Sequence, residues 1–123
     1  MEELSGLLHE VDSDLLNPKR FAIVSLLYAI GPMSLRELRR TLNLTWGDLD
    51  SNIRRLHEKG YVRLWRGLGS GPRILEVKAE LTEAGIREYE KLAQQLSAVL
   101  RKVEEARKLP ANCDQSSLAQ ASR

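Results

Sequence analysis

The segment SLRELRRTLNLTWGDLDSNIRRLHEKGYVRLWRGLGSGPRILEVKAEL, residues 34–81, reads as a helix, a turn, a second helix and a hairpin in immediate succession. Ser34 and Glu37 have the Ser-x-x-Glu spacing in which each side chain satisfies a free backbone N–H group. The first helix should therefore begin at Ser34. Its apolar stripe comprises Leu35, Leu38 and Leu42.

The second helix should run from Trp46 to Lys59, with Thr45 as its N-cap and Gly60 ending it in the left-handed conformation. At 3.6 residues per turn, one side is apolar and must be buried; it carries Leu49, Ile53 and Leu56. The opposite side combines small and polar residues with two guanidinium groups: Gly47, Asp48, Ser51, Arg54, Arg55 and Glu58. Such side chains can reach base edges or phosphates in a DNA major groove, although an ordinary solvated helix face has the same composition.

Two short strands should follow, at residues 61–66 and 74–79, joined by a glycine-rich turn at residues 67–72. The turn lacks the Gly-x-Gly-x-x-Gly and Gly-Lys-Ser/Thr patterns of nucleotide-binding loops, so its glycines are interpreted as hairpin flexibility. A hairpin directly after the second helix favours the DNA-binding interpretation, since its cations can lie on phosphates or in a minor groove. These cations are Arg63, Arg66, Arg73 and Lys78.

Four segments, residues 18–27, 42–56, 57–62 and 81–85, together resemble the winged helix-turn-helix transcriptional regulators of the MarR/ArsR-like group, and within it the small stand-alone prokaryotic winged-helix DNA-binding proteins. The resemblance implies an α+β fold, mainly α. It also implies a dimeric, sequence-specific repressor or activator in the cytoplasm, with residues 46–55 in the major groove and the wing beside them. Metal-sensing relatives carry a Cys pair in the helix that is here Leu35–Arg40, so no metal is expected there. The chain leaves little room for an effector crevice, and whether an effector is sensed stays open.

The expected DNA contacts come from three elements. On the first helix they are Ser34, Arg36 and Arg39; on the recognition helix they are Thr45, Trp46, Gly47, Asp48, Ser51, Arg54 and Arg55; on the wing they are Arg63, Arg66, Arg73 and Lys78. Ser51 and Arg55 are the expected base readers, because a guanidinium group can bind guanine O6 and N7 together. Arg54 is better placed for phosphate. Trp46 either contacts DNA or staples the two helices together.

A long helix should extend from Thr82 to about Leu109, before Pro110. Its apolar residues recur with a spacing near 3.5, which suits pairing with a second helix. The predicted dimer interface comprises Ile86, Tyr89, Leu92, Leu96, Val99, Leu100 and Val103. The alternative is a terminal helix that packs on its own domain. A twofold dimer would place two recognition helices about 34 Å apart and predicts an inverted-repeat operator.

The expected organisation is an N-terminal helical extension at 1–16, a DNA-binding lobe at 17–81, a dimerisation helix at 82–109 and a disordered tail at 110–123. The lobe should start with a core helix capped by Asn17, with Pro18 at its first position. The apolar run in that helix, residues 21–30, is too short to span a bilayer, which needs about 20 residues. No signal peptide opens the chain, which fits a reducing, cytoplasmic compartment.

Charge is unevenly distributed along the 123 residues. Residues 34–78 contain ten Lys or Arg against five Asp or Glu, a net charge of +5, so the remainder carries −3 of the total of +2. A basic segment between acidic ends is expected when one face meets phosphates, and double-stranded DNA is the expected partner. Two other classes stay open: a winged-helix module that binds a polypeptide, and a non-specific architectural DNA binder.

Chemistry other than binding has no support in the sequence. His9 and His57 are separated and form no triad or metal pair with neighbouring residues, so neither an enzyme nor a cofactor nor a metal is expected. Cys113 lies in a polar segment after Pro110, where an incidental cysteine is favoured over a redox sensor.

Overall fold

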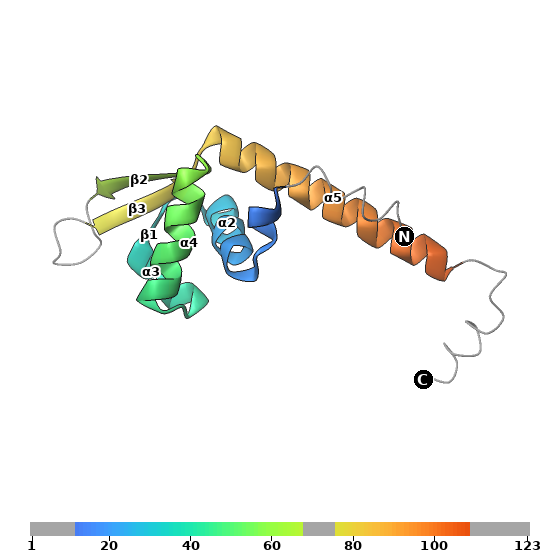
Figure 1. The fold of residues 1–123 in the computed structure, drawn as a ribbon, viewed down its shortest axis with the longest axis horizontal. Coiled ribbons are helices and arrows are strands. Elements are labelled where there is room, and N and C mark those ends of the chain that lie inside the picture. Colours follow the sequence, from blue (N-terminus) through green and yellow to red (C-terminus); the bar gives the residue numbers. More distant parts are fainter. Residues whose placement is uncertain (1–11, 68–75, 109–123) are drawn as a thin grey trace. The chain divides into compact units, whose positions relative to one another are not determined.

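The computed structural model describes residues 12–67 and 76–108 (Figure 1). Along the chain the elements are η1 (Ser13–Leu16), α2 (Pro18–Ile30), β1 (Met33–Ser34), α3 (Leu35–Leu42), α4 (Trp46–Glu58), β2 (Val62–Gly67), β3 (Glu76–Leu81) and α5 (Glu83–Arg107). The chain divides into two compact units, and the boundary falls inside α5. We call the unit Val11–Leu92 the main lobe; the described part of the other unit is residues 93–108 of α5 and its end.

Helix α2 begins as the sequence predicts. The Asn17 side chain accepts hydrogen bonds from the backbone N–H groups of Lys19 and Arg20, and Pro18 occupies the first turn. Gly31, with φ of 101°, ends the helix. Its buried residues are Ile23, Val24 and Leu27, which lie in the centre of the main lobe.

Helices α3 and α4 form the predicted pair. Both halves of the capping box are present, because the Glu37 N–H group donates to Ser34 and the Ser34 N–H group donates to Glu37. Asn43 adopts the left-handed conformation between the helices. Thr45 caps α4 by accepting from the backbone N–H of Asp48, and Gly60, with φ of 79°, follows its end. The predicted bounds of both helices are confirmed to within one residue.

The sheet has three antiparallel strands in the order β1-β3-β2. Strand β1 was not expected, because two residues carry no alternating pattern. The predicted end of the second hairpin strand at residue 79 is wrong: Glu80 pairs with Arg63, and Leu81 pairs with Val62. This register puts Val62, Ala79 and Leu81 together in the core, which explains why the strand continues two residues further.

The start of α5 belongs to the main lobe. Thr82 caps it, since its hydroxyl accepts from the Gly85 N–H group and donates to the Gly60 carbonyl. Gly85 lies so close to the β2 entry that an added Cβ would stand 2.2 Å from the Tyr61 carbonyl oxygen. Leu92 is fully buried. The helix ends at Arg107, near the predicted end at about Leu109.

Candidate nucleic-acid interface

Helix α4 has one buried side, as the helical period predicts. Leu49, Ile53 and Leu56 are at most 3% exposed and hold the helix on the main lobe. Asn52 is also buried, at 7% exposure. Its amide donates to the Asp48 carbonyl at 2.7 Å, so this polar group is satisfied within the helix.

The polar residues of α4 include two stripes that the sequence did not separate, while Asp50 and His57 are exposed on a further side. The first, which we call the outer stripe, is exposed along its length and recurs with the spacing 4, 3, 4: it comprises Gly47, Ser51, Arg54 and Glu58. Arg54 pairs with Asp50 one turn earlier at 2.7 Å, and both side chains are about two-thirds exposed. An exposed pair of this kind contributes little stability, so Arg54 can exchange its partner readily.

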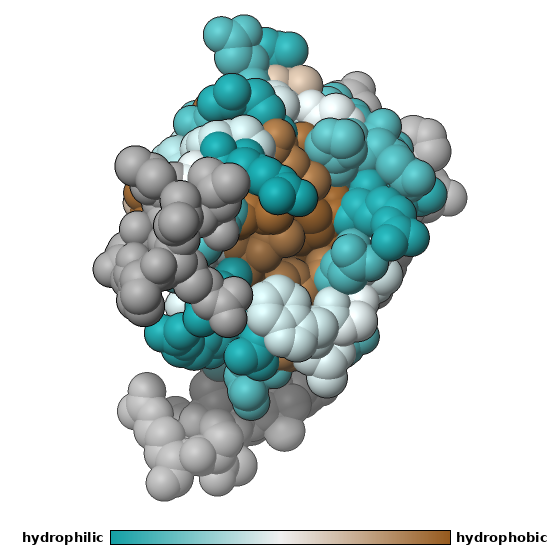
Figure 2. Space-filling model, turned by 90° about the vertical axis from the view of Figure 1, so that its left-hand side faces the viewer, coloured by the Kyte–Doolittle hydropathy of each residue, from teal (hydrophilic) through white to brown (hydrophobic). Residues whose placement is uncertain are grey.

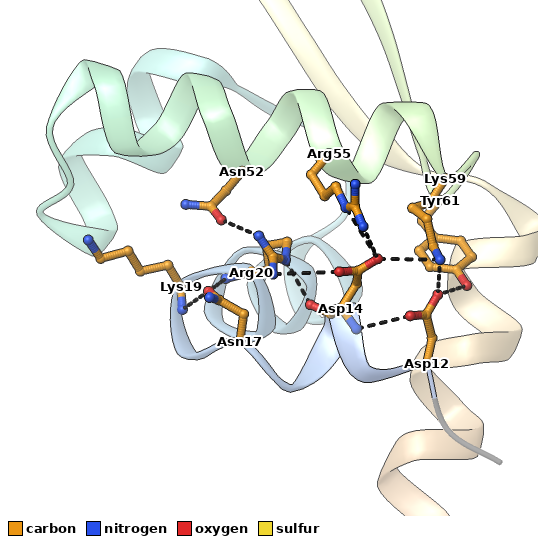
Figure 3. Close-up of polar contacts among 9 residues, drawn as sticks. All are labelled: Asp12, Asp14, Asn17, Lys19, Arg20, Asn52, Arg55, Lys59 and Tyr61. Carbon is orange, nitrogen blue, oxygen red and sulfur yellow. Dashed lines mark hydrogen bonds and ion pairs between the residues drawn. The ribbon is translucent and has the colours of Figure 1, made fainter. Parts of the chain in front are cut away.

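The second stripe, which we call the polar seam, faces η1 and α2 (Figure 3). It comprises Asp48, Asn52, Arg55 and Lys59, again with the spacing 4, 3, 4. From α2, the Lys19 ammonium contacts the Asp48 carboxylate at 2.7 Å, and Arg20 donates to the Asn52 side chain at 2.9 Å. The seam therefore ties α4 to the lobe along one edge of the helix, beside the outer stripe.

The C-terminal half of the seam is held by carboxylates next to η1. Asp14 Oδ2 lies 3.1 Å from an Arg55 guanidinium nitrogen and 3.3 Å from the Lys59 ammonium, so both cations converge on one oxygen atom. Asp12 lies 2.9 Å from the Lys59 ammonium. The two carboxylate side chains are only 15% and 16% exposed, whereas Arg55 is 52% exposed. The cations are the accessible half of this cluster.

Each of these two acidic residues also interacts with a side chain from outside α4. Arg20 Nε donates to the Asp14 carbonyl oxygen at 2.7 Å, and its guanidinium lies 3.7 Å from the Asp14 carboxylate. The Tyr61 hydroxyl donates to Asp12 at 2.6 Å. Burial would raise the pKa of the Asp12 carboxyl, but hydrogen bonds from Tyr61 and Lys59 outweigh it and lower the pKa to about 2. The pKa of Asp14 is lowered for the same reason, since bonds from Arg55 and Lys59 outweigh burial.

Trp46 and Arg39 join α3 to α4 at the helix turn. The Arg39 guanidinium lies 4.9 Å from the centroid of the Trp46 ring, a cation–π geometry. Arg39 Nε is buried, and among the residues that the structure describes it has no hydrogen-bond partner. Trp46 remains 54% exposed, so the ring joins the two helices and still presents a face to solvent.

The remaining α3 residues differ in accessibility. Ser34 is 1% exposed and its hydroxyl is used in the helix cap, so it does not reach a ligand at the surface. Arg36 is half-buried and Arg40 is exposed, and neither has an ion-pair partner among residues 12–67 and 76–108.

The β2–β3 ribbon extends away from the helices (Figure 1). Arg63 forms an ion pair with Glu80 across the strands and lies over the Trp65 ring at 4.7 Å. Arg66, on the opposite face, is exposed. Neither Arg66 nor Lys78 has an ion-pair partner in the described parts of the chain. Arg73 lies outside the described residues.

A view from the end that carries β2, β3 and α3 shows an apolar area surrounded by hydrophilic residues (Figure 2). In the wing, Val77 contributes an exposed apolar side chain, at 37%, on the same strand face as Arg66. A ligand that approaches from this side therefore meets a polar rim around a small apolar centre.

A family model described as a winged helix DNA-binding domain matches residues 19–100, from the first turn of α2 to Leu100 in α5. The chain belongs to the winged helix DNA-binding domain family. In winged-helix terms, α3 and α4 form the helix-turn-helix, α4 occupies the position of the recognition helix, and β2 and β3 form the wing. The fold is that of DNA-binding transcriptional regulators of the MarR type.

Solved structures agree with this assignment. The winged-helix chain is similar to a transcriptional regulator homologue from Pyrococcus horikoshii OT3, with 29% identity and a TM-score of 0.71 over 84% of this chain and 98% of that one. Two more distant structures show the fold alone. The YusO protein from Bacillus subtilis is 14% identical, with a TM-score of 0.66 over 98% of this chain and 84% of that one. The PcaV transcriptional regulator from Streptomyces coelicolor is 18% identical, with a TM-score of 0.61 over 95% of this chain and 79% of that one. No curated protein matches the chain.

The residues predicted for a dimer interface fall into two groups. In the main lobe, Leu92 is fully buried, and Tyr89 donates to Ser25 at 2.8 Å and packs against the rings of Phe21 and Tyr28. These two residues are thus used within the winged-helix lobe. Ile86 is 37% exposed, Leu100 is 68% and Val103 is 49%, while Leu96 and Val99 are half-buried.

Two features are absent from the described residues. Their helices include none with the length and apolar character needed to cross a membrane. The same residues contain no group of three or more His, Cys, Asp or Glu side chains arranged to hold a metal ion.

Proposed function

We propose that this winged-helix chain is a sequence-specific regulator of transcription that binds double-stranded DNA as a homodimer in the cytoplasm. Helix α4 would enter the major groove, and the wing would lie on the backbone or in the minor groove. The observation that carries the proposal is the outer stripe: Ser51 and Arg54 are exposed at adjacent turns of a helix whose apolar side and polar seam are fixed on the lobe.

The outer stripe has the chemistry of base reading. A guanidinium group can bind two acceptors of guanine, and a serine hydroxyl can donate to or accept from several bases. We therefore assign base reading first to Ser51 and Arg54, with Gly47 allowing close approach of the backbone. Arg55, the other candidate base reader, is held by Asp14 in the free protein.

Phosphate contacts are assigned to cations around this stripe. Arg36, Arg66 and Lys78 have no ion-pair partner among the described residues, so they can meet DNA without first breaking a pair. Arg39 with Trp46 and the cap residue Thr45 lie near the start of α4, where backbone N–H groups also favour an anion. Arg63 and Arg73 complete the proposed wing contacts.

The dimer is assigned to α5, chiefly to its outer part. Leu100 and Val103 are large, exposed and one turn apart, and such residues on a long helix favour a second copy as partner. The proposed interface comprises Ile86, Leu96, Val99, Leu100 and Val103.

Selection of bound duplexes from a randomised library tests the function. The full chain should enrich an inverted repeat whose half-sites lie about one helical turn apart. Enrichment of a single asymmetric site would contradict the twofold dimer. Absence of any enriched sequence despite salt-sensitive binding would indicate an architectural DNA binder, and absence of binding at low salt would indicate a protein-interaction module.

A further inference from the structure

The strongest unassigned feature is the convergence of two cations on Asp14 Oδ2. Arg55 Nε lies 3.3 Å from this oxygen, a second Arg55 nitrogen lies at 3.1 Å, and the Lys59 ammonium lies at 3.3 Å (Figure 3). An anionic oxygen held by a guanidinium and an ammonium group is the arrangement that binds a phosphate oxygen. Here a carboxylate from the chain itself supplies that oxygen.

The position of the two cations suits a DNA backbone. Arg55 and Lys59 are one turn apart on one edge of α4, beside the outer stripe. When a helix lies in the major groove, its edges face the phosphates that border the groove. Arg55 is 52% exposed and Lys59 is 36% exposed, so both can be reached from solvent.

The two acidic residues keep partners when the cations leave. An unpaired buried charge is costly, so a pair can open only if the buried member stays satisfied. Asp14 retains the Arg20 guanidinium, and Asp12 retains the Tyr61 hydroxyl. Arg20 is anchored independently by the Asn52 side chain and the Asp14 carbonyl. The cluster is thus built so that Arg55 and Lys59 are its exchangeable members.

We propose that Arg55 and Lys59 form a phosphate-binding pair on the edge of the recognition helix, which Asp14 occupies in the free protein and a DNA backbone phosphate takes over on binding. This inference rests on the proposed function and adds a way in which DNA binding is regulated. Asp14 competes with DNA for Arg55 and Lys59. The competitor lowers affinity for every sequence, so only a duplex that also satisfies the outer stripe is bound tightly.

The test compares Asp14→Asn with Glu83→Gln in the full chain, by anisotropy titration on random-sequence duplex over a range of salt. Glu83 is a matched control, because its removal changes the net charge equally, its side chain is 94% exposed, and its pair with Arg87 on α5 is loose at 3.9 Å. Asp14→Asn should bind random duplex severalfold more tightly than the control. The slope of log affinity against log salt should steepen by about one to two phosphate contacts.

A double substitution keeps the test independent of how Asp14→Asn folds. Arg55→Gln with Lys59→Gln, in the otherwise native chain, should reduce the salt slope by about one to two. Adding Asp14→Asn to that background should then have no effect beyond that of Glu83→Gln.

Three results would overturn the inference. These are equal binding by Asp14→Asn and the control, weaker binding by a natively folded Asp14→Asn, and an unchanged salt slope in the double substitution. Each leaves the proposed function standing if the native chain still prefers its selected duplex. Failure of the native chain to bind any DNA would remove the function and the inference together.

Discussion

The carbonyl oxygen of Tyr61 occupies the space beside Gly85, 2.2 Å from where a Cβ atom would be. This contact fixes the start of α5 against the entry to β2, next to the hydrogen bond from the Thr82 N–H group to the same carbonyl. Only glycine allows the helix to approach a backbone so closely.

Gly85→Ala should therefore destabilise the fold, by about 1 to 3 kcal/mol, because the backbone must move to admit the methyl group. Urea unfolding followed by circular dichroism measures this. Gly47→Ala is the control: the nearest atom to its added Cβ is at 4.0 Å, and alanine should stabilise α4 by about 0.5 to 1 kcal/mol. Equal stability of the two variants would show that the Tyr61 contact is not tight in solution.

Acid should unfold the chain partly through Asp12. Its folded-state pKa of about 2 lies below the unfolded value, so its stabilisation is complete above about pH 4 and is lost as pH falls towards 2. The shift corresponds to about 2 kcal/mol. Asp12→Asn should lower the free energy of unfolding at neutral pH and flatten its decline between pH 4 and 2. If the free energy of unfolding of Asp12→Asn declined between pH 4 and 2 as steeply as that of the native chain, the stabilising role assigned to Asp12 would be refuted.

Sequence choice should depend on Arg54 more than on Arg66. Arg54→Ala removes the exposed guanidinium of the outer stripe and should cost roughly 1 to 3 kcal/mol on the selected duplex, with relaxed preference at one base position. Arg66→Ala removes a wing cation and should weaken selected and scrambled duplexes alike. Parallel anisotropy titrations on both duplexes distinguish them, and equal losses on both duplexes for Arg54→Ala would exclude it as a base reader.

Dimerisation should depend on the exposed apolar residues of α5. Leu100→Glu places a charge in the proposed interface and should convert dimer to monomer, as measured by sedimentation velocity. Gln94→Glu adds the same charge on the opposite side of the helix by the helical period and should leave the dimer intact. A monomeric native chain, or a dimer that survives Leu100→Glu, would contradict the proposed interface.

Local signals allowed much of the fold to be predicted from the sequence. The cap residues Asn17, Ser34 and Thr45 each act within four residues of their own position, and all three lie where the sequence placed them. Strand β1 escaped prediction because its two residues become a strand only by pairing with β3.

The candidate site was less predictable, because the division of the polar residues of α4 into two stripes depends on contacts with residues far away in the sequence. Helical periodicity places Arg54 and Arg55 on the same polar side of α4. The contact of Arg55 with the Asp14 carboxylate, 41 residues before it in the sequence, places Arg55 in the polar seam, whereas Arg54 belongs to the outer stripe. Neither Asp12 nor Asp14 stands in any motif, and no local pattern indicates their partners. The same holds for Leu92, whose apolar spacing suits a dimer interface equally well but which the lobe buries.

Anisotropy titration of the native chain, at near-physiological salt, on its most strongly selected duplex and on a scramble of that duplex tests the central claim most directly. Sequence-specific recognition predicts roughly 10³-fold or greater preference for the selected duplex. Equal affinity for the two duplexes would contradict the account.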